Sequence, residues 1–138
     1  MNYLIDTNVI SELVKPKPDK NVMKWMSCIP DTNIHLSVLT LGEIRKGIEK
    51  IHEPVKKEKL RIWLEHELPD WFGDRFLSID NEVAKRWGRL LAQNKNPAPA
   101  IDSLIAATAL HFDLALVTRN VTDFKLFHDL QIINPWEV

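Results

Sequence analysis

Short apolar runs alternate with longer amphipathic segments along the chain, and this alternation predicts strands followed by helices. The longer segments place apolar residues three or four positions apart, as Leu41, Ile44 and Ile48 do in TLGEIRKGIEKI. Strands that alternate with helices are typical of a parallel sheet covered on both faces. We therefore predict an α/β fold around a five-stranded parallel sheet. The predicted strands are YLID, NIHLSV, FLSID, LALVT and QIINP.

Prolines separate the predicted helices. Since proline cannot continue a helix, KPKPD and NPAPA are expected to be breaks. The segment IDSLIAATALHF is apolar nearly all round, which is typical of a buried helix. Helices are predicted from about residue 7 to 14, over KNVMKWMSC, over TLGEIRKGIEKI, from residue 54 to about 71, and over NEVAKRWGRLLAQN and IDSLIAATALHF, with a short helical turn at DFKLF.

Length and composition limit the class of protein further. A chain of 138 residues with 45% hydrophobic and 27% charged residues is expected to form one domain over residues 1–138. The single cysteine, Cys28, excludes an internal disulfide and a cysteine-based zinc cluster. The net charge of −1 does not by itself indicate a nucleic-acid binder. Without a secretion signal or an apolar run of about 20 residues, we expect a cytoplasmic protein with no membrane contact.

Acidic residues distant in the sequence are predicted to meet at one edge of the sheet. In open parallel sheets, binding sites form outside the carboxyl ends of the strands. Asp6 and Asp80 end the first and third predicted strands, and Asp123 lies just after the fourth. Glu43 lies in the helix after the second strand, and Asp102 opens the buried helix. The sheet edge is therefore expected to carry several carboxylates.

Helix capping is a structural explanation for several of these residues. The letters DTN after the first strand favour a cap, and so does Asp80 before the next helix. Thr40 and Glu43 match the capping-box pattern, in which the glutamate reaches back to the threonine N–H. Asp123 follows Asn120 by three residues and is a candidate cap for the short turn.

Burial makes capping an insufficient explanation for two of them. Asp102 lies on a helix with almost no polar face, and Asp6 ends a strand that is expected to be central. A buried, ionised carboxylate is costly unless it is paired or binds a metal ion. No lysine or arginine lies near either residue in the sequence. A set of oxygen ligands without cysteine favours a hard ion, Mg²⁺ or Mn²⁺.

Four segments resemble the motifs of PIN-domain nucleases, and the most similar branch is the VapC and FitB-type toxins of bacterial toxin–antitoxin pairs. One such motif is a weak signal, whereas four in the order and spacing of the family, over the full length of the chain, are a strong one. The segments are YLIDTNVISEL, LTLGEIRKGIEK, PAIDSLIAATAL and LVTRNVTDFKLF.

The resemblance implies a Mg²⁺-dependent endoribonuclease that acts as the toxin of a type II toxin–antitoxin system. It implies a homodimer that binds RNA as substrate and a small cognate antitoxin, whose tail enters the acidic groove. DNA would be contacted only through the antitoxin. The implied residues are Asp6, Glu43, Asp102 and Asp123 for metal binding and catalysis, Asn8, Thr118 and Asn120 for support of the pocket, and Arg45 and Arg119 for contact with a substrate phosphate.

The implied reaction is hydrolysis of an RNA phosphodiester bond by water. One or two Mg²⁺ ions would lower the pKa of the attacking water, and the products would carry a 5′ phosphate and a 3′ hydroxyl. Glu43 or Asp102 would accept the proton of that water, and the sequence does not choose between them.

Three other functions fit part of the pattern. A receiver domain also has five strands, an aspartate after the third (Asp80) and a threonine after the fourth (Thr118), but it needs a lysine after the fifth strand, which is absent here. A dehalogenase-like phosphatase needs Asp-x-Asp at the first strand, where position 8 is Asn. A catalytically idle module acting as a co-repressor would not need four carboxylates.

The tryptophans are expected to pack rather than to stack on RNA bases. Trp63 and Trp87 lie at helical spacing with leucines, which favours a core or a subunit interface. The five are Trp25, Trp63, Trp71, Trp87 and Trp136.

Overall fold

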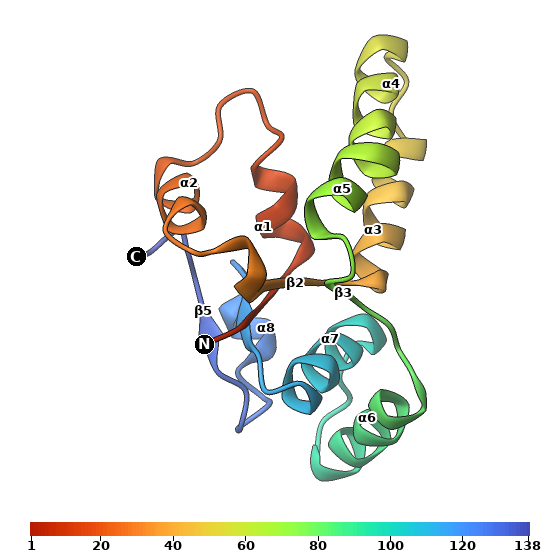
Figure 1. Cartoon of the computed structure of the whole chain (residues 1–138). Helices are drawn as coiled ribbons and strands as arrows, with labels where there is room; N and C mark the ends of the chain where they lie inside the picture. The colour runs from red at the N-terminus through yellow and green to blue at the C-terminus, as the bar shows by residue number, and fades with distance from the viewer.

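The computed structural model describes residues 1–138 and has a central five-stranded sheet in the order β3-β2-β1-β4-β5 (Figure 1). All four strand pairs are parallel, as predicted. In the central strand, Leu4 pairs with His35 on one side and with Leu116 on the other. Asp6 therefore leaves the middle of the sheet at its carboxyl edge. The strands are β1 (Tyr3–Ile5), β2 (Ile34–Ser37), β3 (Phe76–Leu77), β4 (Ala115–Val117) and β5 (Ile132–Ile133).

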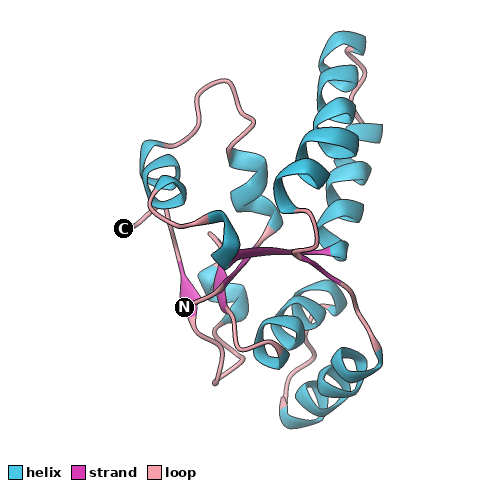
Figure 2. Ribbon diagram, in the orientation of Figure 1, coloured by secondary structure: helices cyan, strands magenta, loops and turns pink.

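Helices cover both faces of the sheet, with α1–α5 on one side and α6–α8 on the other (Figures 1 and 2). None of these helices is long and apolar enough to cross a membrane. The helices are α1 (Thr7–Glu12), α2 (Lys20–Ser27), α3 (Val38–Glu49), α4 (Pro54–Ile62), α5 (Leu68–Phe72), α6 (Asn81–Gln93), α7 (Ala100–His111) and α8 (Val121–Phe124), with a 3₁₀ turn at Asp31–Asn33 and a π-helical turn at Trp63–Glu67.

Two hydrophobic cores follow from the alternation of side chains along the strands. Leu4 and Leu116 point to the side of α6–α8, where they pack with the apolar residues of α7. Ile5 and Val117, each one position later, belong to the core beneath α1–α5. Both strands are thus apolar on both faces, as expected of a covered parallel sheet.

The predicted caps had mixed outcomes. The cap at Asp80 is confirmed, because its Oδ1 accepts a hydrogen bond from the Val83 N–H at 2.9 Å where α6 begins. The capping box at Thr40 is wrong, since α3 begins three residues earlier with Ser37 as its N-cap. The cap at Asp123 is also wrong. This residue lies inside α8, which begins at Val121 and has no side-chain cap.

The helix predicted from residue 54 to about 71 is present in three consecutive pieces: α4, the π-helical turn and α5. Trp63 and Leu68 from these pieces are buried in the core, so the predicted packing of Trp63 is confirmed. The last piece ends at Gly73, whose φ of 54° is a conformation that glycine adopts without steric cost.

Candidate active site

The four carboxylates expected to form a site all lie at the carboxyl edge of the sheet. Asp6 directly follows β1 and is the N-cap of α1. Glu43 lies in α3, which follows β2, and Asp123 lies in α8, which follows β4. Asp102 is in the first turn of α7. The fold therefore brings to one edge residues that are up to 117 positions apart in the sequence, from position 6 to position 123.

Asp6 is the buried centre of the site, with a side chain held by three donors. Its Oδ2 accepts a hydrogen bond of 2.8 Å from the Thr118 hydroxyl and a longer one of 3.3 Å from Asn8 Nδ2. Its Oδ1 accepts from the Thr7 N–H at 2.9 Å, so this carboxylate also caps α1. With only 8% of the residue exposed, burial raises the pKa of Asp6 despite these hydrogen bonds, and the nearby charges of Glu43 and Asp102 raise it further.

Glu43 is positioned by a hydroxyl that the sequence did not single out. The Thr7 hydroxyl donates to Glu43 Oε1 at 2.6 Å and lies 3.0 Å from the hydroxyl of Thr40. Thr40 is itself fully buried inside α3. The glutamate thus points away from its own helix start and toward α1, which is the reason that the predicted capping box does not form.

Asp102 has a half-buried carboxylate with no hydrogen-bond partner in the protein. Burial raises its pKa first, and the charges of Asp123 and Glu43 raise it further. These couplings place Asp102 within electrostatic reach of both residues. Its two oxygens remain free to accept a ligand or a proton.

The donor set fits a divalent cation chemically. None of the four carboxylates takes part in any of the ion pairs in the protein, so no lysine or arginine offsets their mutual repulsion. An ion such as Mg²⁺, which prefers oxygen ligands, would remove that repulsion. The expected convergence is incomplete, however: no three acidic, histidine or cysteine side chains are grouped closely enough to hold one ion, and Asp6 and Glu43 are each hydrogen-bonded within the protein.

The predicted supporting residues form a hydrogen-bonded relay around Asp6. Asn8 Nδ2 donates to the Thr118 hydroxyl at 3.2 Å as well as to Asp6, and Asn8 Oδ1 accepts from the Arg119 N–H at 3.1 Å. The Asn120 N–H also donates to the Thr118 hydroxyl, at 3.1 Å. Thr118 is fully buried, so its hydroxyl is a fixed hub between β1 and the loop after β4.

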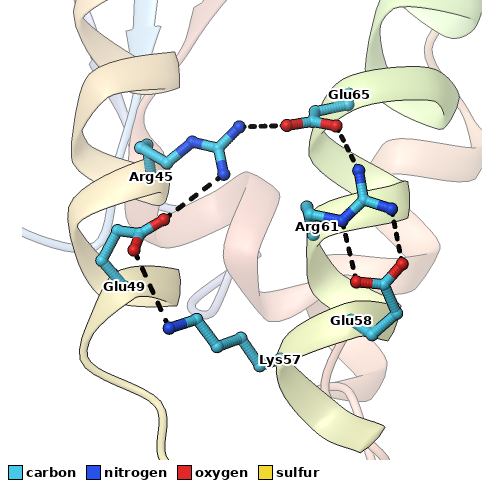
Figure 3. A network of polar contacts seen from close by, with 6 residues as sticks. All are labelled: Arg45, Glu49, Lys57, Glu58, Arg61 and Glu65. Atoms are coloured by element: carbon cyan, nitrogen blue, oxygen red, sulfur yellow. Dashed lines mark hydrogen bonds and ion pairs between the residues drawn. The ribbon is translucent and has the colours of Figure 1, made fainter. Parts of the chain in front are cut away.

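The two arginines expected near a substrate phosphate have different surroundings. Arg45 points to the side of α4, where its guanidinium pairs with Glu65 of the π-helical turn that follows α4. It also lies 3.6 Å from Glu49 of α3, in a chain of charges that Figure 3 shows in full. The phosphate contact predicted for Arg45 is therefore not supported. Arg119 follows β4, and its guanidinium lies 4.9 Å from the centre of the Trp136 ring.

The raised pKa of Asp102 predicts how stability depends on pH when no divalent ion is present. A native pKa above the unfolded one means that the native protein holds its proton to a higher pH, so this stabilising contribution is present at low pH. It is lost as pH rises above the ordinary aspartate pKa of about 3.9 and through the raised native value. Asp102→Asn removes this loss. We compare the free energy of unfolding of Asp102→Asn with that of the parent protein, both measured by denaturant titration in EDTA. The value for the variant minus the value for the parent should increase from pH 4 to pH 7. A difference that stays constant or falls would contradict the prediction.

Comparison with known proteins agrees with this geometry. The PIN domain family model matches residues 3–127. The toxin FitB of Neisseria gonorrhoeae is 33% identical over 136 residues, covering 96% of this chain and 97% of that protein. The VapC ribonuclease Y4jK of Sinorhizobium fredii is 34% identical over 137 residues, covering 97% of each.

A solved structure is similar over almost the whole length. The crystal structure of FitAcB from Neisseria gonorrhoeae superposes with a TM-score of 0.90 and 32% identity, covering 99% of both chains. The family match, the relatives and the fold agree with one another. The chain belongs to the PIN-domain family, in the branch of the VapC ribonucleases and the FitB toxin.

Proposed function

We propose that this protein is an endoribonuclease toxin of a type II toxin–antitoxin system and that it hydrolyses RNA with the help of Mg²⁺ or Mn²⁺. One observation carries the proposal: four carboxylates lie at one edge of the sheet without a cationic side chain to pair with, and the charges of neighbouring carboxylates help to raise the pKa of Asp6 and Asp102. The relatives that are named a VapC ribonuclease and a toxin support a nuclease activity for this chain.

Asp6, Glu43, Asp102 and Asp123 are the residues that would hold the ion. A bound divalent ion supplies positive charge that makes water more acidic and offsets the charge of the reacting phosphate. Thr118 and Asn8 fix the orientation of Asp6, and the Thr7 hydroxyl fixes that of Glu43.

Asp102 is the better candidate for the general base. Its carboxylate has no hydrogen-bond partner, whereas Glu43 already accepts from Thr7. The raised pKa of Asp102 also brings its proton affinity closer to neutral pH, where a general base is most effective. A proton taken from the attacking water would go to an Asp102 oxygen, and the bond to the 3′ oxygen of the leaving strand would break.

A groove on the other side of Glu43 is a binding place for the antitoxin. It has a volume of about 850 Å³ and runs between α1 and the α3–α4 pair, from Thr7 and Glu43 past a mostly apolar floor. Lys15, Lys56 and Lys59 line it. An amphipathic antitoxin segment with acidic residues fits this lining, and a tail continuing beyond it would reach the carboxylates.

Assembly and domain extent are also part of the proposal. β5 lies beyond the residues matched by the family model, and it completes the sheet by pairing with β4. We therefore propose that residues 1–138 act as one domain. A homodimer would cover apolar side chains that α7 leaves exposed, Ile101 and Phe112.

The rival functions have less support from the site. In a receiver domain, Asp80 would be free to accept a phosphoryl group, but here it caps α6. A co-repressor without catalytic activity would not need the four carboxylates. Loss of the cellular effect in Asp102→Asn would separate the nuclease from that module.

Removal of the metal ion tests the proposed chemistry directly. The purified protein, incubated with total RNA and Mg²⁺, is expected to leave fragments with 5′ phosphate and 3′ hydroxyl ends. EDTA should abolish this cleavage, and excess Mg²⁺ or Mn²⁺ should restore it, because the carboxylates alone cannot activate water. Sequencing of the RNA ends reports the target as well. Cleavage that continues in EDTA would contradict the proposal.

A further inference from the structure

A second cavity, which is polar, is lined by Asp123, one of the four carboxylates. It has a volume of about 400 Å³ and is formed by the segment after β4 and the residues after β5. Asp123 lines both this cavity and the acidic cluster, since its charge raises the pKa of Asp102. Small-molecule sites have volumes of about 300–1,000 Å³, so the cavity has room for one nucleotide.

Arg119 is held in place at the wall of this cavity. Its guanidinium lies over the Trp136 ring, and its backbone N–H donates to Asn8 Oδ1, which belongs to the relay around Asp6. The backbone of Trp136 is anchored in turn, because its N–H donates to Asn134 Oδ1 at 3.0 Å and its carbonyl accepts from Asn21 Nδ2 at 2.8 Å. A guanidinium stacked in this way loses little side-chain freedom when it binds an anion.

The cavity also carries polar groups that no residue of the protein uses. The side chains of Asn120 and Thr122 make no hydrogen bond, and Asn134 engages only its oxygen, which leaves its amide N–H groups free. Lys125 lines the cavity and has no ion-pair partner. These groups match the two parts of a nucleotide: cations for the phosphate, and amides and a hydroxyl for the edge of an unpaired base.

We propose that this cavity binds one unpaired nucleotide of the RNA substrate next to the bond that is cut, with Arg119 and Lys125 on its phosphate and with Asn134 and Thr122 at its base. The inference rests on the proposed ribonuclease function and adds the location and the chemistry of a substrate subsite. Single-stranded RNA is recognised through bases that are free of a duplex, and the unused amide and hydroxyl groups of the cavity suit the edge of such a base.

The charges around the cavity agree with this assignment. Asp123 and Glu137 also line it, so the cavity has no net positive charge as long as Asp123 is free. Glu12 is close enough to Arg119 for the arginine to lower the glutamate's pKa, but Glu12 is already paired with Lys15 at 2.8 Å. Once Asp123 binds an ion, Arg119 and Lys125 exceed the remaining acid, so phosphate binding should depend on the divalent ion.

Binding of a short, fluorescein-labelled single-stranded RNA tests the subsite. The measurement uses the parent protein with Mg²⁺ and an RNA with phosphorothioate linkages, which resist cleavage, at several salt concentrations. Arg119→Gln and Lys125→Gln should each raise the Kd about tenfold, as expected for loss of a charge-assisted hydrogen bond. Each should also reduce the slope of log Kd against log salt by about 0.7, the value for one phosphate contact on a single strand.

The matched control is Arg89→Gln, which makes the same change at an exposed arginine without an ion pair on α6. It should leave the Kd and its salt dependence unchanged. In active protein, Thr122→Val should alter the sequence around the cut sites, an effect that a purely structural role would not produce. The RNA in duplex form should bind more weakly than the single strand.

The outcomes distinguish failure of the subsite from failure of the proposed ribonuclease function. RNA that binds and is cleaved, with Arg119→Gln and Lys125→Gln indistinguishable from Arg89→Gln, overturns the subsite and leaves the ribonuclease intact. A parent protein that neither binds nor cleaves RNA overturns both. Circular dichroism of each variant confirms that the fold is kept.

Discussion

Asp102→Asn is expected to reduce RNA cleavage by about a thousandfold or more, the effect of removing a general base and an ion ligand together. The fold should be retained, because the Asp102 side chain makes no hydrogen bond that the substitution would break. The raised pKa of this carboxylate indicates that its charge is unfavourable in the native protein, so the neutral amide should not destabilise it. Single-turnover cleavage of a labelled RNA with Mg²⁺ measures the effect.

Asp80→Asn is the matched control for this substitution. Asp80 lies at the same edge of the sheet, but its carboxylate is used to cap α6 through the Val83 N–H. Asparagine caps helices about as well as aspartate, so both activity and stability should be unchanged. Equal cleavage by Asp102→Asn and Asp80→Asn would show that Asp102 is not part of the catalytic centre.

The second large effect is expected at Thr118. Thr118→Val keeps the shape of a fully buried side chain but removes the hydroxyl that donates to Asp6 and accepts from the Asn120 N–H. Residues that orient metal ligands typically contribute about 10- to 100-fold to ion affinity or activity, and we expect a loss in this range. Because this hydrogen bond lowers the pKa of Asp6, its loss should move the acid limb of the pH–rate profile to higher pH.

Thr108→Val separates this effect from the general cost of losing a buried hydroxyl. Thr108 is also fully buried, and its hydroxyl donates only to the Leu104 carbonyl one turn earlier in α7. This variant should retain its rate and its pH profile. If Thr118→Val matched it in both, the relay around Asp6 would have no role in the reaction.

The parallel sheet, and the edge of it at which the candidate site lies, could be predicted because both follow from local patterns. The periods of strands and helices are visible within ten residues, and the direction of a parallel strand determines at which edge its last side chain lies. Asp6 shows the limit of such reasoning. Capping and site formation were competing interpretations, and in the structure one oxygen of Asp6 caps α1 while the other accepts from Thr118.

What could not be predicted depends on contacts between distant elements. The hydrogen bond from Thr7 to Glu43 exists because α1 packs against α3, which no local pattern encodes. Arg45 lies only two positions from Glu43, but two helical positions are about 200° apart, so it faces α4 instead of the site. Trp136 packs against the core, as expected, but its ring also contacts the guanidinium of Arg119, which the sequence pattern does not indicate.

The position of β1 has a consequence for translation. The central strand is synthesised first, but its second neighbour, β4, follows only after more than a hundred further residues, since Leu4 pairs with Leu116. A nascent chain on the ribosome cannot complete its sheet, or close Thr118 onto Asp6, before this late segment has left the exit tunnel. The ribosome therefore does not face a working nuclease before β4 has been synthesised.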